Sequence, residues 1–80
     1  MRLLDQKSDS ALKSIIVYLT RAEAEELRDS VNDLWEHPHY AAHHHIYCKD
    51  FNRELTICIY NEDDLSGFDE RSKRLIANDD

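Results

Sequence analysis

The sequence has little of what marks several common classes of protein. Its 80 residues include one glycine, one proline and two cysteines. With Gly67 as the sole glycine, a glycine-rich phosphate-binding loop is excluded, and no G-x-S-x-G motif of a serine hydrolase is present. Two cysteines do not form a disulfide framework, which favours a reducing compartment. We therefore predict a protein that is not an enzyme, located in the cytoplasm.

Long apolar runs and an excess of basic residues are also missing. No stretch approaches the roughly 18 apolar residues of a membrane span, and residues 1–5 lack the apolar core of a signal peptide. The chain has 10 Lys and Arg against 17 Asp and Glu, a net charge of −7. Since binding to a phosphate backbone depends on Lys and Arg, we predict no nucleic-acid or membrane partner and favour a basic protein.

The strongest pattern that is present lies at residues 53–60. Leu55, Ile57 and Ile59 alternate with Glu54, Thr56, Cys58 and Tyr60. This period of two, rich in β-branched side chains, predicts a strand with one buried face. We expect this strand to lie in the middle of a small sheet.

Residues 21–36 are predicted to form a long helix. Thr20 and Glu23 match a capping box, and Pro38 ends the helix because it disfavours helical geometry at the residue before it. The apolar residues fall on one stripe of a helix with 3.6 residues per turn: Ala24, Leu27, Val31, Leu34 and Trp35.

Two further strands are expected, at 13–19 and 43–48. The turn at 49–52 makes a hairpin of 43–48 with 53–60. If Cys48 pairs with Arg53, then His43 lies opposite Cys58, the two cysteines are on opposite faces, and no disulfide within the chain is expected. A loop at 37–42, an acidic loop at 61–66 and a short helix at about 67–77 complete the chain.

The predicted fold class is therefore α+β, with the element order β-α-β-β-α in two layers. A mixed three-stranded sheet has the spatial order 13–19, 53–60, 43–48, and the long helix packs on one face. Residues 1–12 are expected to be an irregular, flexible N-terminus, and 13–80 one domain. At this size the stability margin is small, so we also expect a homodimer.

The outer face of that sheet is predicted to be the interaction surface. It carries more aromatic and apolar side chains than a solvent-exposed face needs: Ile16, Tyr18, His43, His45, Tyr47, Thr56, Cys58 and Tyr60. The C-terminal helix, a second copy of the chain or a partner are the three candidates to cover it. The predicted partner-binding residues are the Tyr and His side chains of this face and three acids of the helix: Tyr18, His43, His45, Tyr47, Tyr60, Glu25, Asp29 and Asp33.

A metal site is the alternative interpretation of the histidines. His43 and His45 lie two apart on one strand face with Cys58 across from His43, and these three nitrogen and sulfur ligands are of the types that bind zinc. No C-x-x-C or H-E-x-x-H motif and no clear fourth ligand accompany them. The competing interpretation is that these are ordinary strand histidines that stack among tyrosines, with no cofactor.

Three segments together resemble a known family. Residues 19–27 (LTRAEAEEL), 43–47 (HHHIY) and 54–57 (ELTI) resemble the small acidic immunity proteins of bacterial polymorphic-toxin systems, over roughly residues 14–60. The resemblance implies an inhibitor that binds a cognate toxin without catalysis, and it transfers no binding residue. The sequence thus favours a non-catalytic, immunity-like binding protein with a basic partner such as a toxin; the alternative is a homodimeric His/Cys module for a metal or small ligand.

Overall fold

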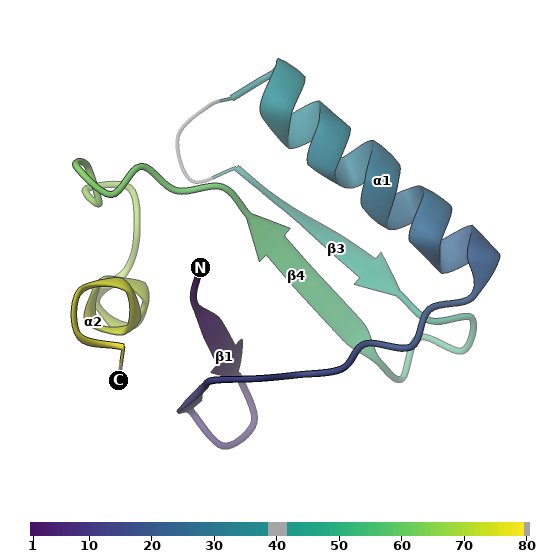
Figure 1. The fold of residues 1–80 in the computed structure, drawn as a ribbon, viewed down its shortest axis with the longest axis horizontal. Coiled ribbons are helices and arrows are strands. Elements are labelled where there is room, and N and C mark those ends of the chain that lie inside the picture. Colours follow the sequence, from purple (N-terminus) through teal and green to yellow (C-terminus); the bar gives the residue numbers. More distant parts are fainter. Residues whose placement is uncertain (39–41, 80) are drawn as a thin grey trace. The chain divides into compact units, whose positions relative to one another are not determined.

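The computed structural model describes residues 1–38 and 42–79. The elements, in chain order, are β1 (Leu3–Asp5), β2 (Ser10–Leu12), α1 (Arg21–Glu36), β3 (His43–Tyr47), β4 (Glu54–Cys58) and α2 (Glu70–Asn78) (Figure 1). The chain divides into two units, one made of Tyr18–Tyr60 and the other of Met1–Val17 with Asn61–Asp80.

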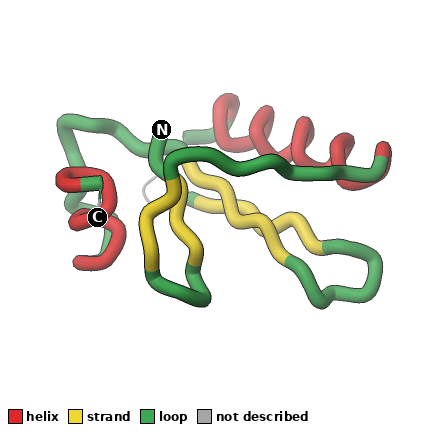
Figure 2. Tube along the Cα trace, turned by 60° about the horizontal axis from the view of Figure 1, so that its bottom comes forward, coloured by secondary structure: helices red, strands yellow, loops and turns green. Residues whose placement is uncertain are grey.

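The predicted three-stranded sheet is wrong. The described residues form two separate antiparallel sheets of two strands each, β1 with β2 and β3 with β4. The predicted strand at 13–19 forms no ladder, and Figure 2 draws this segment as loop leading into α1. Ile16 and Tyr18 are 77% and 88% exposed. Alternation of apolar residues favours extended backbone, but a strand also needs a partner edge, which periodicity alone does not supply.

The unit Tyr18–Tyr60 contains α1 and the β3–β4 hairpin, and its helix forms as predicted. The Glu23 N–H donates to Thr20 Oγ1 (3.2 Å) and the Thr20 N–H donates to Glu23 Oε1 (2.8 Å), which completes the capping box. The helix ends at Glu36, with His37 as the C-cap before Pro38. Residues 39–41 of the predicted loop at 37–42 lie outside the described residues.

The hairpin has the predicted register. His43 lies opposite Cys58, His45 opposite Thr56 and Tyr47 opposite Glu54, and the Cys48 N–H donates to the Arg53 carbonyl (3.1 Å). The strands are slightly shorter than the predicted ranges: β3 ends one residue early, at Tyr47, and β4 begins at Glu54 and ends at Cys58, without Ile59 and Tyr60. Register is specified here because a slip by one residue would move Ile46 and Leu55 off the inner face.

The core of this unit is small and lies between α1 and the hairpin. Leu34 of α1 is 4% exposed and Ile46 of β3 is 3% exposed, and α1 contacts β3 directly (Figure 1). Leu55 and Ile57 on β4 are half-buried. The helix therefore packs on β3, and only part of its apolar stripe is buried. Ile59, predicted to lie on the buried face of its strand, is 49% exposed.

The other unit joins the N-terminal hairpin to α2. Residues 1–12, expected to be irregular, contain β1 and β2, with Leu3 opposite Leu12 and a turn in which Asp5 Oδ1 accepts from the Lys7 N–H (3.0 Å). Arg2 Nε donates to the carbonyls of Leu75 and Ile76 of α2 (both 3.2 Å). Leu75 is the buried residue of this helix, at 7% exposure.

The second helix begins three residues later than predicted. Asp69 is its N-cap, and its side chain accepts from the Ser72 N–H (2.8 Å). The Asp9 carboxylate, in the turn of the N-terminal hairpin, forms ion pairs with Arg71 and Arg74 of this helix. The capping carboxylate therefore sets the start of α2 rather than Ser66 or Gly67.

Candidate functional site

A row of rings lies on the outer face of the β3–β4 hairpin. The His43 and His45 rings meet edge to face with centroids 4.9 Å apart. His45 stacks on Tyr47 at 6.0 Å, and Tyr47 contacts Phe51 at 5.7 Å. We call His43, His45, Tyr47 and Phe51 the aromatic row.

The strand and its turn position these four rings. Residues 43, 45 and 47 share one face because side chains alternate along a strand. Phe51 joins from the turn, where its backbone is left-handed (φ 60°), a conformation unfavourable for a bulky residue. Tyr47 is 40% and Phe51 75% exposed. Sequence reasoning missed Phe51, because its contact with Tyr47 follows from the turn conformation, and no sequence pattern signalled it.

A carboxylate is fixed beside the row. His45 Nδ1 lies 2.8 Å from both Glu54 Oε1 and Thr56 Oγ1, and the Thr56 hydroxyl donates to Glu54 Oε1 (2.8 Å). The pKa of Glu54 is lowered, first by the Thr56 hydroxyl hydrogen bond and then by His45. Glu54 is thus held as a charged, oriented acceptor next to exposed rings.

Asp33, a predicted partner-binding residue, contacts histidines of its own unit. His44 Nε2 lies 2.7 Å from Asp33 Oδ2, and His37 Nδ1 lies 3.2 Å from Asp33 Oδ1. An ionised carboxylate only accepts, so both ring nitrogens are donors. The hydrogen bond from His44 is the main cause that lowers the pKa of Asp33. Asp33 therefore links α1 to β3, although half of its side chain stays exposed (53%).

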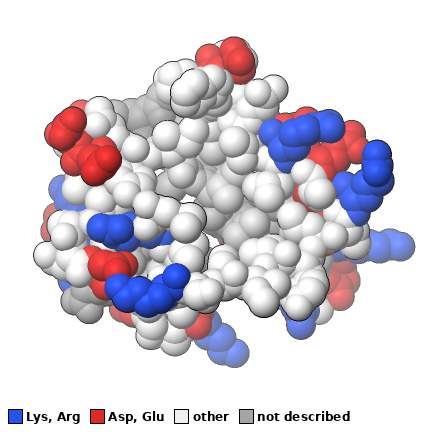
Figure 3. All heavy atoms as spheres, viewed as in Figure 1, with Lys and Arg blue, Asp and Glu red and all other residues white. Residues whose placement is uncertain are grey.

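Glu25 and Asp29, the other two predicted acids, both contact Arg28. The Asp29 Oδ1 to Arg28 Nε distance is 3.0 Å, and Glu25 Oε1 lies 3.7 Å from Arg28 Nη2. All three side chains are exposed. Figure 3 shows basic and acidic side chains next to one another where α1 runs in Figure 1. This part of the helix surface is of mixed charge rather than uniformly acidic.

The two remaining predicted tyrosines lie outside the strands. Tyr18 precedes the cap of α1 and is 88% exposed. Tyr60 follows β4 and is half-buried. Of the five predicted aromatic and histidine residues, the ring contacts join His43, His45 and Tyr47.

The predicted metal ligands lie near one another without forming a metal centre. His43 and His45 are in ring contact, and Cys58 is the strand partner of His43. Within residues 1–38 and 42–79, however, no three His, Cys, Asp or Glu side chains are arranged to hold a metal ion. His45 Nδ1 is already engaged by Glu54 and Thr56.

The two cysteines are not bonded to each other. Cys48 and Cys58 are both free. Partial burial raises the pKa of the Cys58 thiol, although the residue is exposed overall. The thiolate is the form that attacks electrophiles and binds metals, so this environment disfavours both roles.

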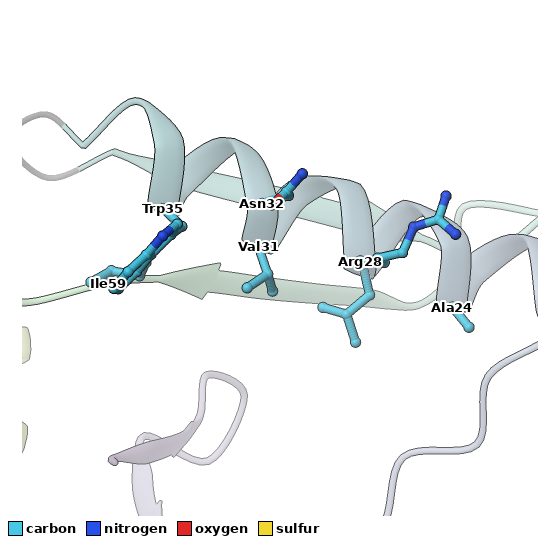
Figure 4. A pocket seen from close by; sticks show the side chains of 7 residues that line it. Ala24, Arg28, Val31, Asn32, Trp35 and Ile59 are labelled. Atoms are coloured by element: carbon cyan, nitrogen blue, oxygen red, sulfur yellow. The ribbon is translucent and has the colours of Figure 1, made fainter.

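A second, apolar feature runs along α1. A shallow groove of about 680 Å³ is lined by Ala24, Leu27, Arg28, Val31, Asn32, Trp35 and Ile59. Figure 4 shows Ala24, Val31 and Trp35 along one side of the helix, with Ile59 beside Trp35 and with Arg28 and Asn32 directed to the other side. We call these seven residues the α1 groove.

Comparisons with known proteins leave the chain without relatives from which a role could be transferred. No protein-family model matches it, and no curated protein or solved structure is significantly similar to it. In the described part of the chain, neither helix has the length and apolar character needed to cross a membrane.

Proposed function

We propose that the protein is a non-catalytic, immunity-like binding protein of the bacterial cytoplasm that inhibits a basic protein partner such as a toxin. The observation that carries this proposal is the aromatic row, four rings in continuous contact on an exposed strand face. Exposed clusters of large apolar side chains usually mark contact sites. Tyrosine is also enriched among the residues that dominate binding energy.

The side chains of the row are suited to binding because they are already ordered. Each ring except the first and last contacts two others, so little side-chain entropy remains to be lost on association. Glu54 adds a charged acceptor whose position is fixed by His45 and Thr56. A Lys or Arg of a partner that packs on the rings would reach this carboxylate and stack on an aromatic face.

Net charge supports the basic partner. At −7, the chain attracts a positively charged protein over distances longer than any contact. Such attraction raises the association rate more than it lowers the dissociation rate. The rings therefore account for affinity, and the acidic residues account for the speed of encounter and for sensitivity to salt.

Coexpression with the product of the neighbouring gene tests the proposal. We expect a complex that copurifies at low salt and that associates more slowly as salt is raised from about 50 to 500 mM, because screening shortens the range of attraction. Tyr47→Ala and Phe51→Ala should each weaken binding by about tenfold or more, as expected for rings central to an interface. Glu54→Gln should weaken it as well.

Tyr18→Ala is the matched control. Tyr18 is an exposed ring in the same unit (88%, against 75% for Phe51 and 40% for Tyr47). It has no part in the aromatic row, so its removal should leave affinity unchanged. The proposal fails if no complex forms, or if Tyr47→Ala and Phe51→Ala bind as tightly as Tyr18→Ala.

A further inference from the structure

The α1 groove leaves apolar side chains uncovered. Trp35 is 73% exposed, Ile59 49% and Val31 46%, and all three line the groove. The same stripe of α1 contributes Leu34 to the core. One part of the apolar face of α1 is therefore buried within the unit, and the other part is not covered by any described residue of that unit.

The small core of this unit gives a reason for a cover. Among its described residues, Leu34 and Ile46 are the buried hydrophobic side chains, and the cysteines are free. Chains of about 80 residues or fewer often add a disulfide, a metal or association with another chain to a small core. Burial of a further Trp, Val and Ile would supply apolar contact of the missing kind.

The two ends of the groove are complementary in size. Its helical residues form three pairs, and the two members of each pair are the same number of positions from the midpoint between Asp29 and Ser30. The pairs are Ala24 with Trp35, Leu27 with Asn32, and Arg28 with Val31. In an antiparallel pair of α1 helices related by a two-fold axis at that midpoint, each Trp35 faces the Ala24 of the other copy. The largest side chain of the groove thus meets the smallest.

The polar edge is also compatible with a two-fold axis. Arg28 and Asn32 share one side of the groove (Figure 4). The two-fold axis brings this side against the same side of the second copy. There, Asn32 of one copy can accept a hydrogen bond from the Arg28 guanidinium of the other. Arg28 is the one charged residue among the described groove residues. It is accompanied by Asp29 and Glu25, so two copies can approach without an unpaired like charge, whereas a basic partner would meet a cation.

From these observations we infer that the α1 groove is the interface of an antiparallel homodimer, with Trp35 of each copy packed on Ala24 of the other. The aromatic row is not part of this interface. The dimer therefore does not depend on the proposed inhibitory function, and each can fail without the other.

Sedimentation of the full chain tests the dimer directly. At about 100 μM, a dimer with a dissociation constant near 1 μM is almost complete, and we expect twice the chain mass of 9.5 kDa. A species of 9.5 kDa at this concentration would overturn the inference.

Two charge variants locate the interface. Val31→Glu places a carboxylate at the centre of the groove and should give a monomer, with unchanged helix content because glutamate is a better helix former than valine. Ala22→Glu, the control, adds the same charge on the opposite, exposed face of α1 and should remain dimeric. A dimeric Val31→Glu variant would show that the copies associate elsewhere.

An exchange of sizes tests the antiparallel arrangement. Ala24→Trp and Trp35→Ala should each weaken the dimer by about tenfold or more, the first by a clash and the second by a cavity. The double variant restores one large and one small side chain at each contact and should recover most of the affinity. If the double variant is as weak as the single ones, Trp35 does not face Ala24 and the arrangement is wrong.

Discussion

At the scale of single residues, Asp33 links two elements of its unit. Its two carboxylate oxygens accept from His44 of β3 and from His37 at the end of α1. Its neighbour Leu34 is the buried residue of the helix. A polar link and an apolar contact thus hold the same turn of α1 on the hairpin.

Asp33→Asn removes the negative charge of this carboxylate. The folded pKa of Asp33 is lowered, mainly by His44, so its carboxylate stabilises the fold above the ordinary pKa of about 3.9 and loses this effect as pH falls toward the folded pKa. Asp33→Asn should therefore lower the free energy of unfolding at pH 7 and reduce its change between about pH 5 and 3. Urea denaturation at several pH values measures both.

Asp29→Asn is the control for this prediction. Asp29 is exposed and pairs with Arg28 one residue away, and such surface pairs contribute roughly 0–1 kcal/mol. Equal stability and equal pH dependence of the two variants would show that the contacts of Asp33 with His44 and His37 do not stabilise the fold.

At the scale of elements, α1 shows how local signals define a helix. Both hydrogen bonds of the capping box are present at Thr20 and Glu23. We predict that Thr20→Ala lowers the free energy of unfolding by about 1 kcal/mol, because the Glu23 N–H then has no side-chain acceptor. Thermal or urea unfolding gives the value. Thr20→Ser keeps the hydroxyl and should differ little from wild type; if Ser and Ala are equally destabilising, the cap is not the cause.

The contact between α1 and β3 should be the most sensitive to truncation. Leu34 is 4% exposed and packs in the core with Ile46. Leu34→Ala should destabilise by about 2–5 kcal/mol through lost burial and a residual cavity, a large part of the stability of a domain this small. Equilibrium unfolding by circular dichroism measures the loss.

Ile16→Ala is the control for Leu34→Ala. Ile16 lies in the segment first predicted as a strand and is 77% exposed, so its truncation should change stability by no more than about 0.5 kcal/mol. A loss as large as that of Leu34→Ala would mean that this segment is packed in solution.

At the scale of the whole molecule, acid should destabilise both units. Carboxylates with a lowered pKa occur in each, Asp5, Asp69 and Asp79 in one and Asp33, Asp50 and Glu54 in the other. Each stabilises the folded state above its ordinary pKa and ceases to do so as it becomes protonated. The net charge of −7 has the opposite effect on stability, because protonation of carboxylates reduces the repulsion among negative charges in the folded state.

We expect the hydrogen bonds to dominate at physiological salt, because screening weakens long-range repulsion over about 8 Å and leaves short contacts nearly intact. Stability should then be highest between about pH 5 and 7 and fall toward pH 2. Urea midpoints across this range at about 0.15 M salt test the balance. A continuous rise in stability from pH 7 down to pH 3 would show that repulsion dominates.

The sequence by itself determined the features that depend on neighbours along the chain. The limits of α1 follow from Thr20, Glu23 and Pro38, and the hairpin register follows from alternation and a short turn. The net charge is likewise a property of composition. These features need contacts between residues close in sequence, where little chain entropy is lost when they form.

The tertiary structure alone decided which apolar residues find partners. Residues 13–19 alternate as a strand does yet pair with no strand in the described part of the chain. Val31 and Trp35 share a stripe with Leu34 yet stay exposed. Phe51 contacts Tyr47 of the aromatic row from the turn, where the backbone of Phe51 itself is left-handed. Periodicity indicates which side chains point the same way. Which groups pack opposite them depends on contacts between distant segments, and the free energies of those contacts cannot be inferred from a local sequence pattern.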